Sequence, residues 1–555
     1  MTAWMVAFDR MWPCFGASGR CAALSALVWA AAVLHAGPAI AQVNCGSLTA
    51  ARCTQATGQY QILQSFQSLP NPSTGANVFK SDLAAVVNIY LNATAGQRNQ
   101  AAANSHGVFT AGDARPQYNL WSQISASSPI LSTLQAFPQL QISSALAATL
   151  TERIDLRQSE PLYAAITELL TGDSSSSTNN ISAVQQVTAL KDSFTAYAAA
   201  FAGQSTQYAN AGQIDPRPFQ ISTSIANNPW TSAQASASAI DAQQSEWGTP
   251  GAGNGLQTEA AFPSGHSTQG FTTALLYGLL VPEAYQSMMV SGQQFGLSRN
   301  IMGVHHTLDV IGGRVLAYYT MTQLLAGNTD YILTGVPSYS GIPAYTDFAT
   351  YVSDLSAALH TALGSTYAAV PYASCASNVA GCIAGGAFPS ASQFAAANQA
   401  YADLATYGLP SVGATNLAAV VPTNAELLLT SRFPYLTNAQ IREVLATTEL
   451  PSGGPLDDGS GWVRLNLFKA AGGYGAFNSN VSVTLDGSSG FNAVDMWSND
   501  ISGTGRLTKG GAGLLILGGN NSYSGGTTVA GGTLALTGTM VGDLTIDAGA
   551  SVVSG

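Results

Sequence analysis

The stretch AFPSGHSTQGF, residues 261–271, sets the tetrapeptide PSGH shortly before the apolar run FTTALLYGLL. The run has the periodicity of a buried helix, so PSGH falls at the first turn of that helix. A helix N-terminus offers free backbone N–H groups and a partial positive charge, and Gly265 lets an anion approach them closely. The stretch therefore predicts a helix that presents Ser264 and His266 to an anion.

The composition is typical of an exported protein whose surface is polar but nearly uncharged. Of 555 residues, 46% are hydrophobic and only 8% are charged, against about a quarter charged in ordinary soluble domains. The formal net charge is −11. This charge excludes nucleic acid and anionic lipid as main partners, because both require a basic face.

Residues 1–41 are predicted to be a signal peptide. Arg10 and Arg20 precede an apolar run that ends in the small-x-small pattern AIA at 39–41. A transmembrane anchor is the alternative, but it needs about 20 apolar residues, more than this run provides. No later run is long and apolar enough to span a bilayer. We therefore expect a mature chain in the periplasm, at the cell surface or outside the cell.

Four cysteines would remain after cleavage: Cys45, Cys53, Cys375 and Cys382. They form two close pairs in the sequence, and each pair could close a small loop in an oxidising compartment. A four-cysteine metal site is the alternative, but neither spacing is Cys-x-x-Cys and no histidine lies beside the pairs. Disulfides are therefore the favoured interpretation.

Composition divides the mature chain into three parts. Residues 42–330 are helix-rich, with helical periodicity in SALAATLTERI, EPLYAAITELL, AVQQVTALKDSFTAYAAAFAG and FTTALLYGLLVPEAYQSMM. Residues 331–480 form a mixed accessory extension. There NAELLLTSRFPYLTNAQIREVL predicts two helices around a turn at Pro434, and GWVRLNLFKAAGGYGAF predicts a strand that runs into a Gly-rich turn. In residues 481–555, short apolar runs alternate with Gly and Asn turns, which predicts repeated β-structure.

Residues that complement PSGH lie on both sides of it. The segment DPRPF holds Arg217, and LSRNIMGVHHTLDVIGGR holds Arg299, His305, His306 and Asp309. Two guanidiniums can bind a tetrahedral oxyanion through paired N–H groups. One histidine can attack phosphorus while another protonates the leaving oxygen, and a carboxylate four residues after His305 can hold its ring. This set of groups suits phosphoryl transfer through a covalent histidine.

The order RP, PSGH, SRxxxxxHxxxD resembles the three-part signature of the type 2 phosphatidic acid phosphatase superfamily, which includes class A bacterial acid phosphatases and vanadium haloperoxidases. The resemblance implies a helical bundle with the site between helices. It makes His305 the nucleophile that forms a phosphohistidine, Asp309 its orienting partner and His266 the general acid. By the same resemblance, the phosphate oxygens are bound by Arg217, Ser264, Gly265 and Arg299.

One position departs from this pattern. The family has a Lys seven positions before the Arg of RP, where this chain has Asn210. Asn210 can still donate a neutral hydrogen bond to phosphate. The lost charge-assisted bond is worth about 1.5–3 kcal/mol, so we expect roughly ten- to a hundredfold weaker transition-state binding.

The signal peptide and the resemblance together imply an exported, metal-independent phosphomonoesterase that acts on a small-molecule phosphate ester, needs no cofactor and is inhibited by vanadate. One alternative is a haloperoxidase of the same fold, in which vanadate is the cofactor. Another is a surface scaffold protein with a decayed site. Structural roles are the alternatives for single residues: Arg217 could pair with Asp215, and His306 falls outside the family interval and could line the site or the surface.

The segment GTGRLTKGGAGLLILGGNNSYSGGTTVAGGTLALTG, residues 503–538, resembles the autotransporter-associated β-strand repeat. The resemblance implies rungs of a right-handed β-helix, with Gly and Asn at the corners and Leu, Ile and Val inside. Each rung needs a neighbour to bury its face. An outer-membrane translocator is the implied partner if the chain is part of a longer one. The complete prediction is thus a mainly α phosphatase domain followed by a short β-solenoid.

Overall fold

The computed structural model describes residues 50–69, 76–109, 205–210, 215–331, 390–554 and part of 348–360. The predicted signal peptide, the side chains of the four cysteines and the expected helices at 144–154, 160–170 and 183–203 lie outside the described residues.

Three helices before residue 110 contribute to the helical core. They are α1 (Ala50–Leu63), α2 (Ala76–Asn92) and α3 (Ala95–Phe109). On α2 the buried apolar residues recur at helical intervals, as in Phe79, Leu83, Val86 and Tyr90. The same buried face carries Asp82, a carboxylate that is 1% exposed.

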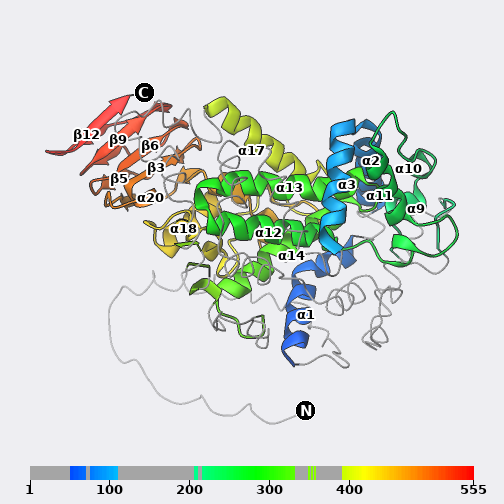
Figure 1. Ribbon diagram of the computed structural model, residues 1–555. Helices are drawn as coiled ribbons and strands as arrows, with labels where there is room; N and C mark the ends of the chain where they lie inside the picture. The colour runs from blue at the N-terminus through cyan, green and yellow to red at the C-terminus, as the bar shows by residue number, and fades with distance from the viewer. Residues whose placement is uncertain are drawn as a thin grey trace, which may run out of the picture. The chain divides into compact units, whose positions relative to one another are not determined.

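The centre of the bundle consists of α12 (Gly265–Leu280), α13 (Tyr285–Ile301) and α14 (Thr307–Leu325), which pack against one another (Figure 1). The apolar run predicted as one helical segment divides at the 3₁₀ turn Pro282–Ala284. Pro282 lacks a backbone N–H, so a continuous helix would lose a hydrogen bond there.

Glycines allow these helices to approach closely where the motifs meet. A Cβ atom on Gly313 of α14 would lie 2.8 Å from the carbonyl oxygen of Ser264, and one on Gly296 of α13 would lie 2.6 Å from Val310. Any larger residue at either position would separate the helices. The second turn of α14 therefore rests on the first turn of α12.

Among the described residues, several shorter elements lie between α3 and α12 in the chain. They are α9 (Pro218–Ile221), α10 (Thr223–Ala226), α11 (Ala237–Trp247) and a 3₁₀ turn at Gly255–Thr258. Trp247 at the end of α11 stacks on Phe219, with ring centroids 5.3 Å apart, and its Nε1 donates to the carbonyl oxygen of Met302 at 2.9 Å. The end of α11 is thereby fixed against the loop that follows α13.

The described part of the accessory extension is helical and contacts the bundle. Its elements are α17 (Ala391–Thr406), η6 (Ala425–Leu429), α18 (Asn438–Thr448), η7 (Trp462–Arg464) and α19 (Leu467–Ala470). Buried Arg314 of α14 donates to the carbonyl oxygens of Ala405 at 3.1 Å and Val463 at 3.0 Å. Tyr285 of α13 donates to the carbonyl oxygen of Leu428 at 2.7 Å.

Two local predictions in this extension are corrected. The pair expected around Pro434 consists of a 3₁₀ turn, η6, and one α-helix, α18. The strand predicted in GWVRLNLF is wrong, because the segment forms η7 and α19. The side chain of Asn466 accepts a hydrogen bond from the backbone N–H of Lys469 at 3.0 Å, which caps a helical turn in the segment where a strand is predicted.

The C-terminal part is a parallel β-solenoid (Figure 1). One sheet stacks β2 (Val481–Thr484), β5 (Leu507–Gly510), β8 (Thr527–Val529) and β11 (Leu544–Ile546). The other stacks β3 (Val494–Trp497), β6 (Leu514–Leu517), β9 (Thr533–Leu536) and β12 (Ser551–Ser554). The predicted fold class, a mainly helical domain followed by a β-solenoid, is confirmed.

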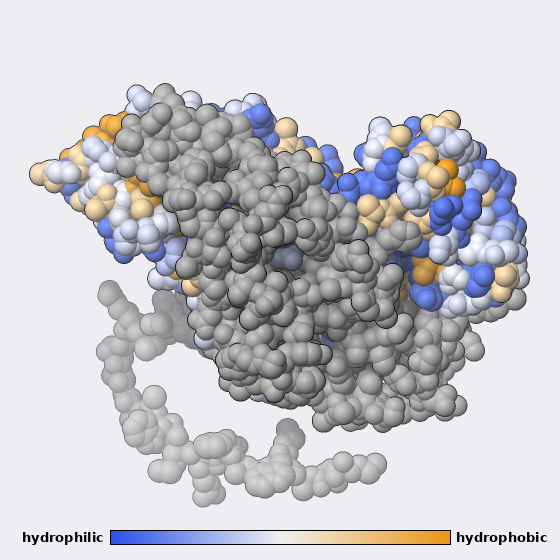
Figure 2. Space-filling view, in the orientation of Figure 1, coloured by the Kyte–Doolittle hydropathy of each residue, from blue (hydrophilic) through white to orange (hydrophobic). Residues whose placement is uncertain are grey.

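The interior of the solenoid also contains a charged residue. Lys509 is fully buried, and its Nζ donates to the carbonyl oxygens of Gly511 at 2.9 Å and Gly531 at 2.8 Å. It therefore ties together glycine corners of successive rungs. Toward β12, hydrophobic surface is visible (Figure 2), and the exposed apolar residues there include Val541 and Ile546. Among the described residues, no helix is long and apolar enough to cross a bilayer.

Candidate active site

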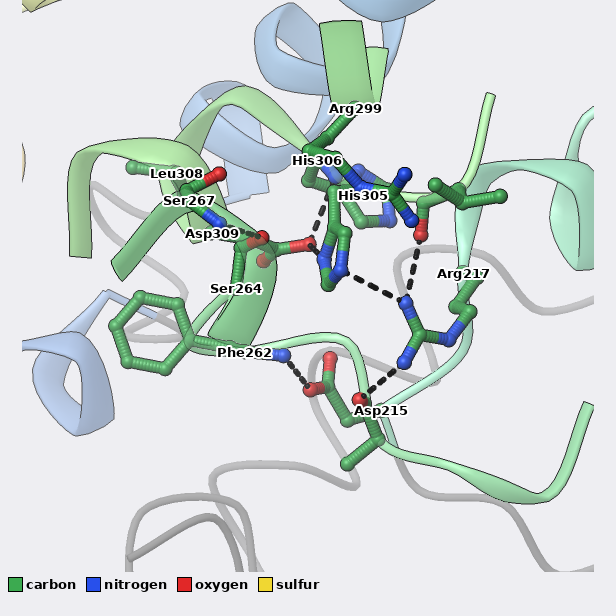
Figure 3. A network of polar contacts seen from close by, with 12 residues as sticks. Asp215, Arg217, Phe262, Ser264, Ser267, Arg299, His305, His306, Leu308 and Asp309 are labelled. Carbon is green, nitrogen blue, oxygen red and sulfur yellow. Dashed lines mark hydrogen bonds and ion pairs between the residues drawn. The ribbon is translucent and has the colours of Figure 1, made fainter. Parts of the chain in front are cut away.

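His305 lies at the centre of a polar cluster just before α14 (Figure 3). Its Nδ1 is 3.1 Å from Oδ2 of Asp309, and its Nε2 is 3.0 Å from Nη1 of Arg217. A guanidinium can only donate, so Nε2 carries a lone pair and Nδ1 carries the proton that Asp309 accepts. The ring is therefore held as the tautomer that a nucleophilic Nε2 requires.

The environment keeps this imidazole uncharged. Burial lowers the pKa of His305 well below its usual value, and the positive charges of Arg217 and Arg299 lower it further. Asp309 also accepts a hydrogen bond from the backbone N–H of His306 at 2.7 Å. Burial raises the pKa of Asp309 well above its usual value, and the nearby carboxylates of Asp215 and Asp82 add to this effect.

Arg217 is oriented by backbone carbonyls on three segments. Nη1 donates to the carbonyl oxygen of Val304 at 3.0 Å, and Nη2 donates to that of Ala260 at 3.0 Å (Figure 3). Nε donates to the carbonyl oxygens of Leu256 and Glu259, each at 3.2 Å. The carboxylate of Glu259 is more distant, at 3.7 Å, and is 53% exposed. The alternative pairing of Arg217 with Asp215 is not what fixes the guanidinium, because these carbonyls already do so.

Arg299 has a carboxylate partner that the sequence did not indicate. Its Nη1 and Nη2 donate to the two carboxylate oxygens of Glu246, at 3.1 and 2.6 Å. Arg299 is fully buried, while the side chain of Glu246 is 15% exposed. No motif marks Glu246, which lies 53 residues before Arg299, near the end of α11.

The PSGH segment forms the first turn of α12 as predicted. Ser264 is its N-cap: the hydroxyl accepts from the backbone N–H of Ser267 at 3.2 Å, and its own N–H donates to the carbonyl oxygen of Asp309 at 3.0 Å. Because the hydroxyl is an acceptor in this contact, its proton remains available for an anion. Gly265 follows as the first helical residue.

His266 is buried beside the two arginines. Burial lowers its pKa well below the usual value, and the charges of Arg299 and Arg217 contribute in the same direction. A neutral imidazole is therefore favoured in the unliganded site. The negative charge of a bound phosphate would favour its protonated form.

Asn210 belongs to the short described segment 205–210. This segment is held against α9, where Nε2 of Gln220 donates to the carbonyl oxygen of Tyr208 at 3.2 Å. The described residues show no hydrogen bond between Asn210 and the histidine–arginine cluster. Its assignment as a phosphate-binding position stays a prediction.

His306 and Arg314 are both buried, and each bonds to backbone carbonyl oxygens. His306 is buried, and its Nε2 is 3.2 Å from the carbonyl oxygen of Pro216. Arg314 is engaged by the accessory extension. Within the described parts of the chain, no group of three or more His, Cys, Asp or Glu side chains is placed to hold a metal ion.

Comparison with known families agrees with this geometry. The model of the PAP2 superfamily matches residues 194–329, which contain all three motifs. Residues 194–329 are therefore similar to the PAP2 superfamily. An acid phosphatase of Zymomonas mobilis is 38% identical over 77 residues, which cover 14% of this chain and 29% of that enzyme. The predicted resemblance to the superfamily is confirmed for this segment.

The PAP2 segment is followed by a repeat from another class of protein. Residues 507–536, within the solenoid, match the passenger-associated-transport-repeat. The neisserial autotransporter lipoprotein NalP of Neisseria meningitidis is 34% identical over 151 residues, covering 26% of this chain and 13% of NalP. An extracellular serine protease of Serratia marcescens is 33% identical over 173 residues, covering 25% of this chain and 17% of the protease. The chain thus spans less than a third of the length of each of these relatives.

Proposed function

We propose that this protein is an exported phosphomonoesterase that hydrolyses a small-molecule phosphate ester through a phosphohistidine on His305. The observation that carries the proposal is the contact of the buried His305 with two partners, which leaves the Nε2 lone pair directed at Arg217. A nucleophile oriented by a third group and facing an anion-binding cation is the arrangement that covalent phosphoryl transfer requires.

In the first half of the proposed reaction, the ester oxygens take the hydrogen bonds that Arg217 gives to His305. The Nε2 lone pair attacks phosphorus as the bond between phosphorus and the leaving oxygen breaks. His266 gives its proton to that oxygen, and the alcohol departs. Asp309 keeps the Nδ1 proton in place while the ring gains positive charge.

In the second half, His266 accepts a proton from a water molecule whose oxygen attacks phosphorus. The phosphorus–nitrogen bond breaks, its electron pair returns to Nε2, and inorganic phosphate leaves. The equatorial oxygens are bound by Arg217, Arg299, the Ser264 hydroxyl and the backbone N–H groups at the start of α12. Donors fixed before the reaction stabilise the charge that develops in the transition state.

Export and attachment belong to the same proposal. Two relatives are named as an autotransporter lipoprotein and an extracellular protease, which supports export of this chain. We infer that the solenoid links the phosphatase domain to an outer-membrane translocator. No cofactor is required, and vanadate acts as an inhibitor because it mimics the pentacoordinate transition state.

Purified protein should release phosphate from p-nitrophenyl phosphate at acid pH. EDTA should leave the rate unchanged, and vanadate should inhibit competitively. Addition of vanadate, peroxide and bromide should give no halogenation. Halogenation without phosphate release would favour a haloperoxidase, and the absence of both activities would favour a scaffold protein.

A further inference from the structure

Asp82 brings a buried carboxylate from a distant helix to the start of α14. Its Oδ1 accepts from the backbone N–H of Thr307 at 2.7 Å, from the Thr307 hydroxyl at 2.5 Å and from the N–H of Leu308 at 3.4 Å. The N–H groups of Thr307 and Leu308 belong to the first turn of α14 and therefore have no partner within the helix. Asp82 lies in α2, outside the residues that match the PAP2 superfamily.

The other oxygen of the same carboxylate faces His306. Oδ2 of Asp82 lies 3.7 Å from Nδ1 of His306, and Nε2 of that ring lies 3.2 Å from the carbonyl oxygen of Pro216. A backbone carbonyl can only accept, so Nε2 carries a proton. Nδ1 of a neutral ring then turns its lone pair toward Asp82. The two atoms, 3.7 Å apart, lie beyond direct hydrogen-bond distance, but an ionised carboxylate would repel the lone pair, so a protonated Oδ2 is favoured.

The geometry indicates where that proton resides. Oδ1 of Asp82 is occupied by three donors, so a proton on the carboxyl belongs on Oδ2, facing His306. Burial raises the pKa of Asp82 to about 7 and lowers the pKa of His306 to about 4. Both directions favour a neutral acid beside a neutral imidazole. Charged groups near this pair include Arg217, which acts on His306, and Asp309, which lies near Asp82.

We propose that Asp82 and His306 form a second acid–imidazole pair that positions the nucleophile and its anion-binding partner. The pair connects α2, the first turn of α14 and the loop before Arg217. Asp82 fixes the turn that carries Asp309 beside His305, and His306 fixes the carbonyl of Pro216, next to Arg217. The inference rests on the proposed function, because it concerns the orientation of that site. His306 cannot itself be the nucleophile while its Nε2 donates to Pro216.

Asp82 offers a variant that imitates the protonated acid. Asp82→Asn keeps an oxygen for Thr307 and places an N–H opposite Nδ1 of His306, whereas Asp82→Ala removes both. Asp82→Ala should lower kcat/KM for p-nitrophenyl phosphate and vanadate affinity at least about tenfold, and Asp82→Asn should stay within about threefold of wild type. Asp241→Asn, on the exposed side of α11, is the control for loss of a carboxylate.

Histidine variants test the pair independently if Asp82→Ala does not fold. His306→Gln keeps an N–H for Pro216 and should retain most of the activity, whereas His306→Leu should lose it at least about tenfold. Circular dichroism would confirm that each variant is folded. If Asp82 and His306 only filled space, Asp82→Asn and His306→Gln would not retain more activity than Asp82→Ala and His306→Leu.

Wild-type protein is measured first. If it neither hydrolyses the ester nor binds vanadate, the proposed function is wrong. If wild type is active and folded Asp82→Ala or His306→Leu is equally active, the positioning pair alone is wrong. Equal losses in Asp82→Ala and Asp82→Asn would also overturn the pair, because the amide keeps the oxygen that Thr307 bonds and places an N–H toward His306.

Discussion

Arg217 donates a hydrogen bond from Nη1 to Nε2 of His305 across 3.0 Å. The guanidinium stays protonated at all accessible pH values, so this contact holds the imidazole lone pair toward an anion-binding cation. An entering phosphate ester can take the place of this hydrogen bond: one of its oxygens then accepts from Arg217, and its phosphorus atom faces Nε2 of His305. In the unliganded site the His305 ring therefore already has the orientation that the proposed attack requires.

The first prediction is an acid pH optimum. Turnover needs neutral His305 and protonated His266, and burial beside two arginines puts both pKa values well below the usual 6.5. As pH rises, His266 loses its proton and kcat/KM should fall, while at still lower pH His305 gains a proton and kcat/KM should fall again. The optimum should therefore lie below pH 6.5.

The control for this profile is His266→Ala with p-nitrophenyl phosphate, whose leaving group needs little protonation. The fall on the alkaline side should disappear in this variant. An optimum above pH 7, or the same alkaline fall without His266, would contradict the assignment of the general acid.

The second prediction concerns Asn210. Restoring the family residue with Asn210→Lys should tighten vanadate binding and raise kcat/KM by up to roughly ten- to a hundredfold, the value of one charge-assisted hydrogen bond. Ala209→Lys is the matched control, since Ala209 is an exposed neighbour in the same segment. Equal effects of the two lysines would show that only the overall charge matters and that position 210 does not face the anion.

The third prediction compares the carboxylate partners of the two arginines. Glu246→Ala leaves the fully buried Arg299 without its paired carboxylate, so the free energy of unfolding should fall by about 3–5 kcal/mol. Glu259→Ala should cost less than about 1 kcal/mol, because Glu259 is half exposed and more distant. Urea denaturation measures both. Equal losses would mean that Arg299 has another partner of the same strength.

The fourth prediction concerns the solenoid. Asp495 of β3 pairs with Arg432 of the accessory extension at 2.8 Å, and Nε1 of Trp497 donates to Tyr435 at 2.8 Å. A chain cut after residue 485 loses both contacts and should unfold more readily, because Arg432 is buried. A chain cut after residue 540 keeps them and should turn over substrate at the wild-type rate.

Thermal unfolding and p-nitrophenyl phosphate hydrolysis would compare the two cuts with the full chain. Loss of activity in a folded chain cut after 540 would give the outer rungs a part in the substrate site. Full stability of the chain cut after 485 would show that the first rung does not support the accessory extension.

Much of the central site follows from local sequence. His305 lies just before α14 and Asp309 is the third residue of that helix, so the local turn at the helix N-terminus brings them into contact. PSGH was expected at a helix N-terminus because a long apolar run follows, and α12 starts there. The break between α12 and α13 also had a local signal in Pro282.

Other contacts of the site had no such signal. Glu246 and Asp82 are single carboxylates on helices whose sequence separation from their partners is 53 and 225 residues. Their roles depend on tertiary packing, which periodicity does not encode. The error in GWVRLNLF has a similar cause, since the Asn466 cap stabilises a helical turn where the sequence predicts a strand. The contact of Arg314 with the accessory extension also required the structure.

The central claim is that His305 becomes phosphorylated during turnover, and His305→Ala should therefore abolish hydrolysis without unfolding the chain. His360→Ala is the control, because His360 lies outside the cluster and contacts Glu283. Circular dichroism should show the same helix content in both variants and in wild type.

The most direct measurement is to mix wild-type enzyme with p-nitrophenyl phosphate, stop the reaction in alkali, in which phosphohistidine survives, and locate the phosphoryl group by peptide mass spectrometry. We predict one phosphoryl group on His305, a burst of p-nitrophenol that matches its amount, and neither signal in His305→Ala. Steady hydrolysis without a phosphoenzyme, or a phosphoryl group on His266 or His306 instead, would contradict the account.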